Sequence, residues 1–148
     1  MKIKGTNKAD SLLGSAGDDV ISGGRGNDWL EGGAGNDTLT GDAGHDTFVL
    51  RANGGHDTVT DFNASEDVVM FDTQSGVYDG MLGWSAGPSL WDGAQIYNSH
   101  ETLVCTVHAG DYNGDGIGDT QFEMSSGATL TLLGVDPSDL GCSNLFGG

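Results

Sequence analysis

A repeat of nine residues dominates the first third of the chain. The stretch GGRGNDWLEGGAGNDTLT holds two adjacent copies, and the spacing extends over five copies in residues 5–49. Every copy opens with glycine, has aspartate at the sixth place, and has a large apolar residue at the eighth. The aspartates are Asp10, Asp19, Asp28, Asp37 and Asp46, and the apolar residues are Leu12, Ile21, Leu30, Leu39 and Phe48. Such regularity indicates a repeated structural unit.

Each place in the unit has a physical role. The last three residues are too few to bury anything as a helix, but they suffice for a short strand with one side chain pointing inward. Glycine at the first, second and fourth places permits a tight turn with positive φ. Two units then form one coil, and each unit stacks on the unit eighteen residues later. The repeat therefore predicts an all-β fold, a parallel β-roll whose apolar eighth places fill the core.

The charge of the chain points to a cation. It carries 22 acidic against 5 basic residues, a formal net charge of -17. We therefore expect neither nucleic acid nor an anionic membrane surface as a partner, because their phosphates would be repelled. Stacked turns also bring carboxylates together, and those like charges need a counter-ion. Ca²⁺ takes 6–8 oxygen ligands from carboxylates and backbone carbonyls, which such turns can supply.

The repeat resembles the RTX (hemolysin-type) family, whose consensus is G-G-x-G-x-D-x-U-x. This resemblance implies a parallel β-roll that binds Ca²⁺ between stacked turns. One turn would supply the carbonyls of its second and fourth places and its aspartate. The turn eighteen residues later would supply the carbonyls of its first and third places and its own aspartate.

Carried onto this chain, the resemblance implies three pairings of turns. They are Gly24, Gly26 and Asp28 with Gly41, Ala43 and Asp46; Ser15, Gly17 and Asp19 with Gly32, Ala34 and Asp37; and Thr6, Lys8 and Asp10 with Gly23, Arg25 and Asp28. The third is expected to be the weakest, since it contains two basic side chains. A further half-site is formed by Gly33, Gly35 and Asp37. Asp57 follows Asp37 by twenty residues, so its participation requires a bulge.

The segment after the repeats resembles the end of RTX rolls in serralysin-like proteases. Asp57, Asp61 and Asp67 are candidate late ligands there, and a solvated acidic turn is the alternative for Asp61 and Asp67. Four apolar runs follow, at residues 94–98, 102–107, 120–124 and 128–135, and predict antiparallel strands. We therefore expect a calcium-binding roll at residues 1–60 and a C-terminal capping region at residues 61–148.

The final stretch, SDLGCSNLFGG, is similar to the uncleaved C-terminal export signal of bacterial type I secretion, although it ends in two glycines. This resemblance implies a secreted, extracellular protein that meets a type I secretion apparatus. No apolar run approaches the ~20 residues that a membrane-spanning helix requires.

Three other features leave alternatives open. In DYNGDGIGD, the residues Asp111, Asn113, Asp115 and Asp119 match places one, three, five and nine of an EF-hand loop, but the flanks are strand-like. This loop is either a calcium site or a tight acidic hairpin. Cys105 and Cys142 either form a disulfide or remain thiols. Trp84 and Trp91 either stack on a carbohydrate or pack within the protein.

The zinc-protease motif H-E-x-x-H does not occur in the sequence. His45 and His56 each precede an aspartate in a predicted turn, which suits a solvated side chain better than a catalytic base. We expect a non-enzymatic module that folds on binding Ca²⁺ outside the cell and supports type I secretion and stability of a secreted protein. The alternative is a carbohydrate-binding (alginate-type) module of an extracellular polysaccharide-modifying enzyme. A larger parent chain or a polysaccharide would then be a partner.

Overall fold

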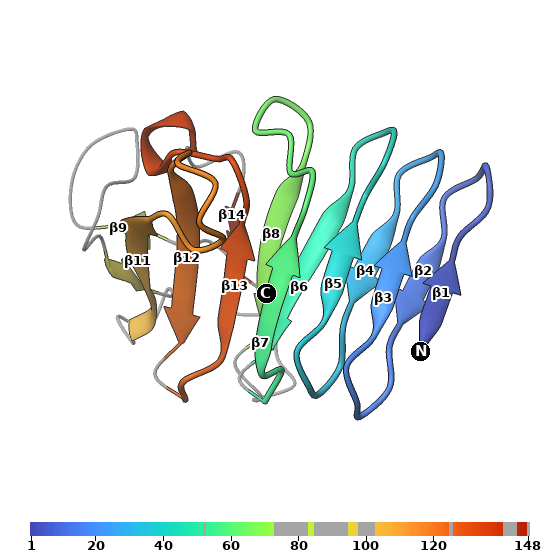
Figure 1. Cartoon of the computed structure of the whole chain (residues 1–148), viewed down its shortest axis with the longest axis horizontal. Helices are drawn as coiled ribbons and strands as arrows, with labels where there is room; N and C mark the ends of the chain where they lie inside the picture. The colour runs from blue at the N-terminus through green and yellow to red at the C-terminus, as the bar shows by residue number, and fades with distance from the viewer. Residues whose placement is uncertain are drawn as a thin grey trace.

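The computed structural model describes most of the chain, namely residues 1–51, 53–72, 83–84, 95–97, 103–124, 126–140 and 145–147. Its first half is a parallel β-roll in which successive strands alternate between two facing sheets (Figure 1). One sheet receives β1 (Lys2–Lys4), β3 (Val20–Ser22), β5 (Thr38–Thr40) and β7 (His56–Val59). The other receives β2 (Ser11–Leu13), β4 (Trp29–Glu31), β6 (Thr47–Arg51) and β8 (Val68–Asp72).

The predicted eighteen-residue register is confirmed over the repeats. Leu12 lies beside Leu30, and Leu30 lies beside Phe48, along one sheet. In the other sheet Ile21 pairs with Leu39 at the same spacing. Beyond the repeats the spacing grows, because Thr38 pairs with Thr58 and Thr47 pairs with Val68. The longer turns that precede these last strands absorb the additional residues.

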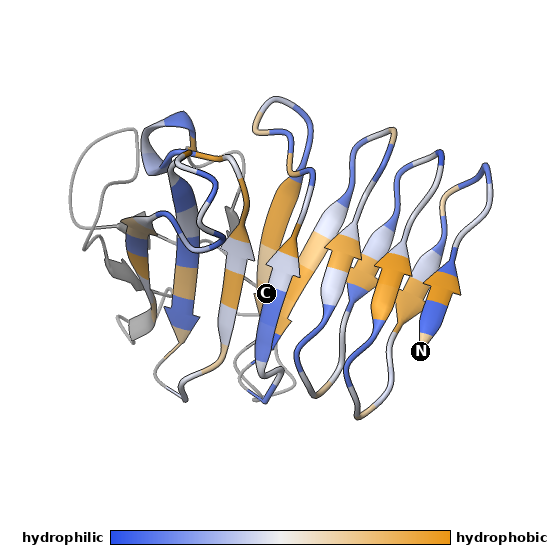
Figure 2. Ribbon diagram, viewed as in Figure 1, coloured by the Kyte–Doolittle hydropathy of each residue, from blue (hydrophilic) through white to orange (hydrophobic). Residues whose placement is uncertain are grey.

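Eighth-place side chains form the core between the two sheets. Leu30, Leu39 and Phe48 have no exposed surface. The strands are apolar at their centres, which Figure 2 shows in orange, and the turns that connect them are mostly blue or pale. Trp29, next to Leu30, is only half-buried on the outer face. The inward eighth place and the outward seventh place are therefore confirmed.

An antiparallel sheet continues one face of the roll. It consists of β9 (Gly83–Trp84), β10 (Gln95–Tyr97), β11 (Leu103–Gly110), β12 (Asp119–Met124) and β13 (Thr129–Leu132). Strand β13 pairs in parallel with β7, and the pairs from β13 to β9 are antiparallel. The predicted antiparallel region is thus confirmed, and its parallel junction with the roll is an addition to the prediction.

The other face of the roll ends in β14 (Leu145–Gly147), which pairs in parallel with β8. A short 3-10 helix, η1 (Pro137–Asp139), lies between β13 and β14 in the chain. The rings of Phe71 in β8 and Phe122 in β12 meet edge to face, with centroids 5.4 Å apart. One core therefore continues past residue 60, and the division into two domains at that residue stays a prediction.

Several sequence-based hypotheses fall outside the described residues. Cys105 is a buried free thiol, whereas Cys142 is not described. Trp91 and the side chain of Trp84 are likewise not described, nor are residues 141–144 and 148 of the segment that resembles an export signal. Among the described residues no helix has the length and apolar character needed to cross a bilayer.

Candidate metal sites between the turns

Close contact between consecutive turns explains the glycines of the repeat. Gly24, at the second place, has φ +97, and a Cβ there would collide with the carbonyl oxygen of Thr6 in the turn below. Gly26, at the fourth place, has φ +114, and its Cβ would lie 2.8 Å from the Lys8 carbonyl oxygen. Both positions require positive φ and leave no room for a side chain.

The first place is a meeting point of oxygen atoms. A Cβ on Gly23 would collide with Asp28 Oδ2 and would lie 2.8 Å from the carbonyl oxygen of Gly41. The carboxylate comes from the same turn and the carbonyl from the turn eighteen residues later. Oxygen atoms of two consecutive turns are thus held around one small space.

Sixth-place aspartates form a ladder on each side of the roll, linked through backbone N–H groups. Asp10 N–H donates to Asp28 Oδ1 (2.9 Å), and Asp28 N–H donates to Asp46 Oδ1 (3.0 Å). On the other side, Asp19 N–H donates to Asp37 Oδ1 (2.7 Å). The structure therefore brings together the aspartates that the eighteen-residue pairing predicts.

Both ladders continue beyond the repeats. Asp37 N–H donates to Asp57 Oδ1 (3.1 Å), and Asp46 N–H donates to Asp67 Oδ1 (2.9 Å). Asp57 and Asp67 thus take the sixth place in longer turns, and the enlarged spacing expected for Asp57 is observed. Their role as metal ligands stays a prediction.

The second carboxylate oxygen of the central aspartates is left unsatisfied. Within the described part of the chain, Oδ2 of Asp28, Asp37 and Asp46 is buried and has no hydrogen-bond partner. These residues are only 2%, 1% and 1% exposed. A buried acceptor without a partner is strongly unfavourable, and a buried charge more so. This arrangement needs a positive group between the turns.

The pKa values of two buried carboxyls also reflect the lack of a positive group between the turns. Burial raises the pKa of Asp46 to about 6, and the nearby charges of Asp67, Asp28 and Asp61 add to the rise. Burial also raises the pKa of Asp57 to about 8, with the charge of Asp37 contributing. A carboxyl near a cation would shift the opposite way.

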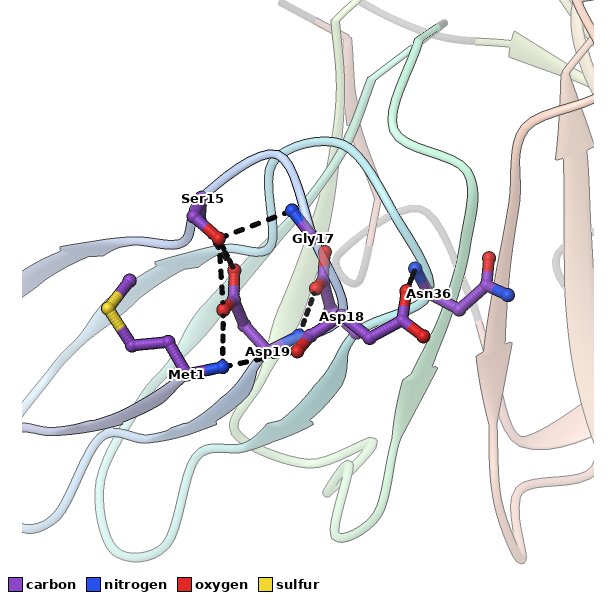
Figure 3. Close-up of polar contacts among 7 residues, drawn as sticks. Met1, Ser15, Gly17, Asp18, Asp19 and Asn36 are labelled. Atoms are coloured by element: carbon purple, nitrogen blue, oxygen red, sulfur yellow. Dashed lines mark hydrogen bonds and ion pairs between the residues drawn. The ribbon is translucent and has the colours of Figure 1, made fainter.

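The first two turns of the roll satisfy their aspartates differently. Asp10 Oδ2 accepts the backbone N–H of Thr6 (2.6 Å) and the Thr6 hydroxyl (2.9 Å). Asp19 Oδ2 accepts the N–H and the hydroxyl of Ser15. The Met1 ammonium lies 2.9 Å from Asp19 Oδ1 (Figure 3). The Ser15 N–H and then this ammonium lower the pKa of Asp19.

A second polar ladder, which the sequence analysis missed, runs along the fifth place. Asn36 N–H donates to Asp18 Oδ1 (2.8 Å), as Figure 3 shows. His45 N–H donates to Asn27 Oδ1 (3.0 Å), and His56 N–H donates to Asn36 Oδ1 (3.2 Å). Aspartate or asparagine at the fifth place of three consecutive copies was the available signal. These bonds hold the turns in register beside the aspartate ladders.

Asp61, a late-ligand candidate, binds backbone groups. Its Oδ1 accepts Gly41 N–H (2.8 Å) and its Oδ2 accepts Asp42 N–H (2.7 Å). Asp42 has φ +67, and no other non-glycine residue in the described part of the chain has a positive φ. Asp61 therefore closes the strained turn that opens the fifth copy.

The DYNGDGIGD loop forms a tight hairpin between β11 and β12. Asp111 accepts N–H groups from Gly114 (2.8 Å) and Gly116 (2.9 Å), and these bonds lower its pKa. Asp119 is fully buried and accepts N–H groups from Tyr112 (2.9 Å) and Gly134 (2.7 Å). The hairpin alternative thus describes the observed conformation, and calcium binding by the loop remains untested.

The ligands available between the turns fit calcium. Among the described residues, no three His, Cys, Asp or Glu side chains converge on one point. A cation would therefore bind a pair of aspartates and complete its shell with backbone carbonyls. Ca²⁺ accepts this all-oxygen mixture with flexible geometry, whereas zinc prefers nitrogen and sulfur.

Comparison with known proteins agrees with this geometry. The family model "RTX calcium-binding nonapeptide repeat (4 copies)" matches residues 2–30, 13–48 and 23–59. No curated protein sequence matches significantly. Solved structures that match include a subunit of a mannuronan C5-epimerase from Azotobacter vinelandii, at 23% identity and TM-score 0.30, covering 95% of this chain and 79% of that one.

An extracellular lipase from Serratia marcescens also matches, at 22% identity and TM-score 0.48. The match covers 97% of this chain and 20% of the lipase. Because these values are low, neither similarity bears on what this chain does. The repeat motif, the observed roll and the family match agree: residues 2–59 are RTX calcium-binding nonapeptide repeats.

Proposed function

We propose that this chain is a module that folds when Ca²⁺ binds between its stacked turns. The observation that carries the proposal is the unsatisfied, buried Oδ2 of Asp28, Asp37 and Asp46. Three buried acceptors in a chain of net charge -17 oppose the closed roll unless a cation joins them. Backbone carbonyls of neighbouring turns would complete the coordination.

The energetic logic makes calcium a switch. A ligand that binds only the folded state stabilises it in proportion to RT ln(1 + [L]/Kd). At a Kd of about 10⁻⁴ M, millimolar calcium contributes roughly 1.4 kcal/mol per site, and cytosolic calcium contributes almost nothing. Because the turns share aspartates and stack on one another, several sites would respond together.

This switch suits a protein that leaves the cell. The chain would stay unfolded at low cytosolic calcium, pass a type I secretion apparatus, and fold in the calcium-rich exterior. The family of the repeats and the likeness of residues 138–148 to an export signal support this part of the proposal. The module would then stabilise whatever secreted protein contains it.

Far-ultraviolet circular dichroism tests the folding step. In chelator residues 5–60 should be largely unstructured, which weakens the β signal of the chain, and millimolar Ca²⁺ should restore that signal. Mg²⁺ should fail, because it demands shorter bonds and near-octahedral geometry. As a control, Asp139→Asn removes an exposed carboxylate outside the repeats and should leave the calcium midpoint unchanged. Equal spectra with and without chelator would contradict the proposal.

Export requires its own experiment. A bacterial host with a type I apparatus would express the chain with and without its last eleven residues, 138–148. We expect the shortened chain to stay inside the cell. Asp28→Asn with an intact C-terminus should still be exported, since the calcium sites would be empty in the cytosol. Equal extracellular amounts of the full and shortened chains would refute the export role.

A further inference from the structure

The turns of the roll are of two kinds, and the residue at the second place separates them. In the capped turns, which end at Asp10 and Asp19, the second place is Thr6 or Ser15. In the open turns, which end at Asp28, Asp37 and Asp46, the second place is Gly24, Gly33 or Asp42. The two kinds differ in what happens to the Oδ2 atom of the aspartate.

Capped turns use both lone pairs of that oxygen. Asp10 Oδ2 accepts Thr6 N–H at 2.6 Å and the Thr6 hydroxyl at 2.9 Å. Asp19 Oδ2 accepts the same two groups from Ser15, with the hydroxyl at 2.9 Å. A carboxylate oxygen offers two lone pairs in its plane, so two donors occupy it fully. A metal ion would have to displace one of these bonds.

Open turns leave the oxygen free because their backbone differs. The second place has φ +97 in Gly24, +94 in Gly33 and +67 in Asp42. Thr6 and Ser15 do not share this conformation, since Asp42 is the one non-glycine residue with positive φ in the described part of the chain. Glycine also has no hydroxyl to offer. As a result, Oδ2 of all three aspartates is buried without a partner.

We propose that the second-place residue decides whether a turn takes calcium. The capped turns, the first on each side of the roll, take no ion of their own, and calcium binds where Asp28, Asp37 or Asp46 provides the free oxygen. This inference rests on the proposed calcium binding, and it changes which pairs of turns are expected to hold an ion. The pairings that begin at Asp10 and Asp19 take no ion, although the family pattern includes them.

The position of the free oxygen supports this assignment. Asp28 Oδ2 and the Gly41 carbonyl oxygen converge at the α-carbon of Gly23, so oxygens of two turns already face one space. The equivalent space below contains Asp10 Oδ2, but there the Thr6 N–H and hydroxyl donate into it. In the capped turn, the two hydrogen-bond donors of Thr6 thus occupy the position that a cation would take in an open turn.

Counting bound calcium by isothermal titration calorimetry tests the inference. Asp19→Asn and Asp28→Asn form a matched pair, since both residues are buried and both occupy the sixth place of a ladder. Asp28→Asn should lose at least one ion relative to the wild-type chain. Asp19→Asn should bind the wild-type number. Loss of an ion in Asp19→Asn comparable to the loss in Asp28→Asn would overturn the inference.

A second variant tests the role of the second place directly. Ser15→Gly removes the hydroxyl and permits positive φ, so it should bind one ion more than the wild type. Ser15→Thr retains the hydroxyl, as Thr6 does one turn earlier, and should bind the wild-type number. An unchanged count in Ser15→Gly, with its β signal intact, would overturn the inference. A wild-type chain that binds no calcium in this titration would instead refute the proposed function.

Discussion

Removal of the Leu30 side chain should move the calcium midpoint of folding without touching a ligand. Leu30 is fully buried and lies between Leu12 and Phe48 in consecutive strands of one sheet. A leucine-to-alanine change in such a core costs about 3 kcal/mol, because a cavity remains between its neighbours. The backbone of β4 and both neighbouring turns would keep their conformation.

The size of the shift follows from linkage between folding and binding. If three ions bind on folding, one for each open turn, a loss of about 3 kcal/mol raises the midpoint about fivefold. If only two ions bind, the same loss raises the midpoint about thirteenfold. The measured shift in Leu30→Ala therefore also reports how many ions are coupled to folding.

Trp29→Ala is the matched control, because Trp29 adjoins Leu30 but is half-buried on the outer face. A loss of about 1 kcal/mol or less is expected there, which moves the midpoint by only about twofold or less. Calcium titrations of both variants by far-ultraviolet circular dichroism give the two midpoints. A larger shift in Trp29→Ala than in Leu30→Ala would mean that the inside and outside of the roll are assigned the wrong way round.

Three further outcomes are expected. Asp28→Ala should reduce calcium stoichiometry and cooperativity more than Asp10→Ala in isothermal titration, because Asp28 Oδ2 is free whereas Thr6 occupies Asp10 Oδ2. Similar losses would contradict the distinction between open and capped turns. Gly44→Ala should destabilise the calcium-bound roll in thermal melts more than Gly114→Ala. Both glycines have positive φ, but a Cβ on Gly44 collides with the Gly26 carbonyl whereas one on Gly114 meets nothing within 4 Å; equal losses would refute the clash. In calcium-free buffer, the roll should gain stability as the pH falls. Burial raises the pKa of Asp46 to about 6 and that of Asp57 to about 8 from 3.8, so the folded state binds more protons in this interval. Circular dichroism should therefore show more β structure near pH about 5 than above pH about 8, and the reverse order would contradict the burial of these carboxyls.

The nine-residue period was sufficient to predict the roll and its core. Asp28 and Leu30 recur at fixed places, and a fixed period allows only one stacking register. The same logic failed where the period ends. Nothing in the pattern gives the longer spacing from Asp46 to Asp67, because that turn contains no glycine repeat. The parallel pairing of β13 with β7 joins segments far apart in sequence, and periodicity carries no information on such pairs.

The distinction between capped and open turns also escaped the sequence analysis. Ser15 and Gly24 both occupy the second place, where the consensus has glycine. Whether the Oδ2 atom of the sixth-place aspartate is occupied or free depends on the backbone φ at the second place and on the direction of its N–H group. Only the three-dimensional structure shows that Ser15 donates to Asp19 while Asp28 receives no equivalent bond within the described residues.

A crystal structure determined in millimolar calcium, with anomalous scattering to identify the ion, tests the central claim most directly. The turn from Gly24 to Asp28 and the turn from Gly41 to Asp46 are the place to examine. We expect an anomalous peak between them, within coordination distance of Asp28 Oδ2 and the Gly41 carbonyl oxygen, about 2.3–2.6 Å for calcium. A fully folded roll with no peak between these turns would contradict the account.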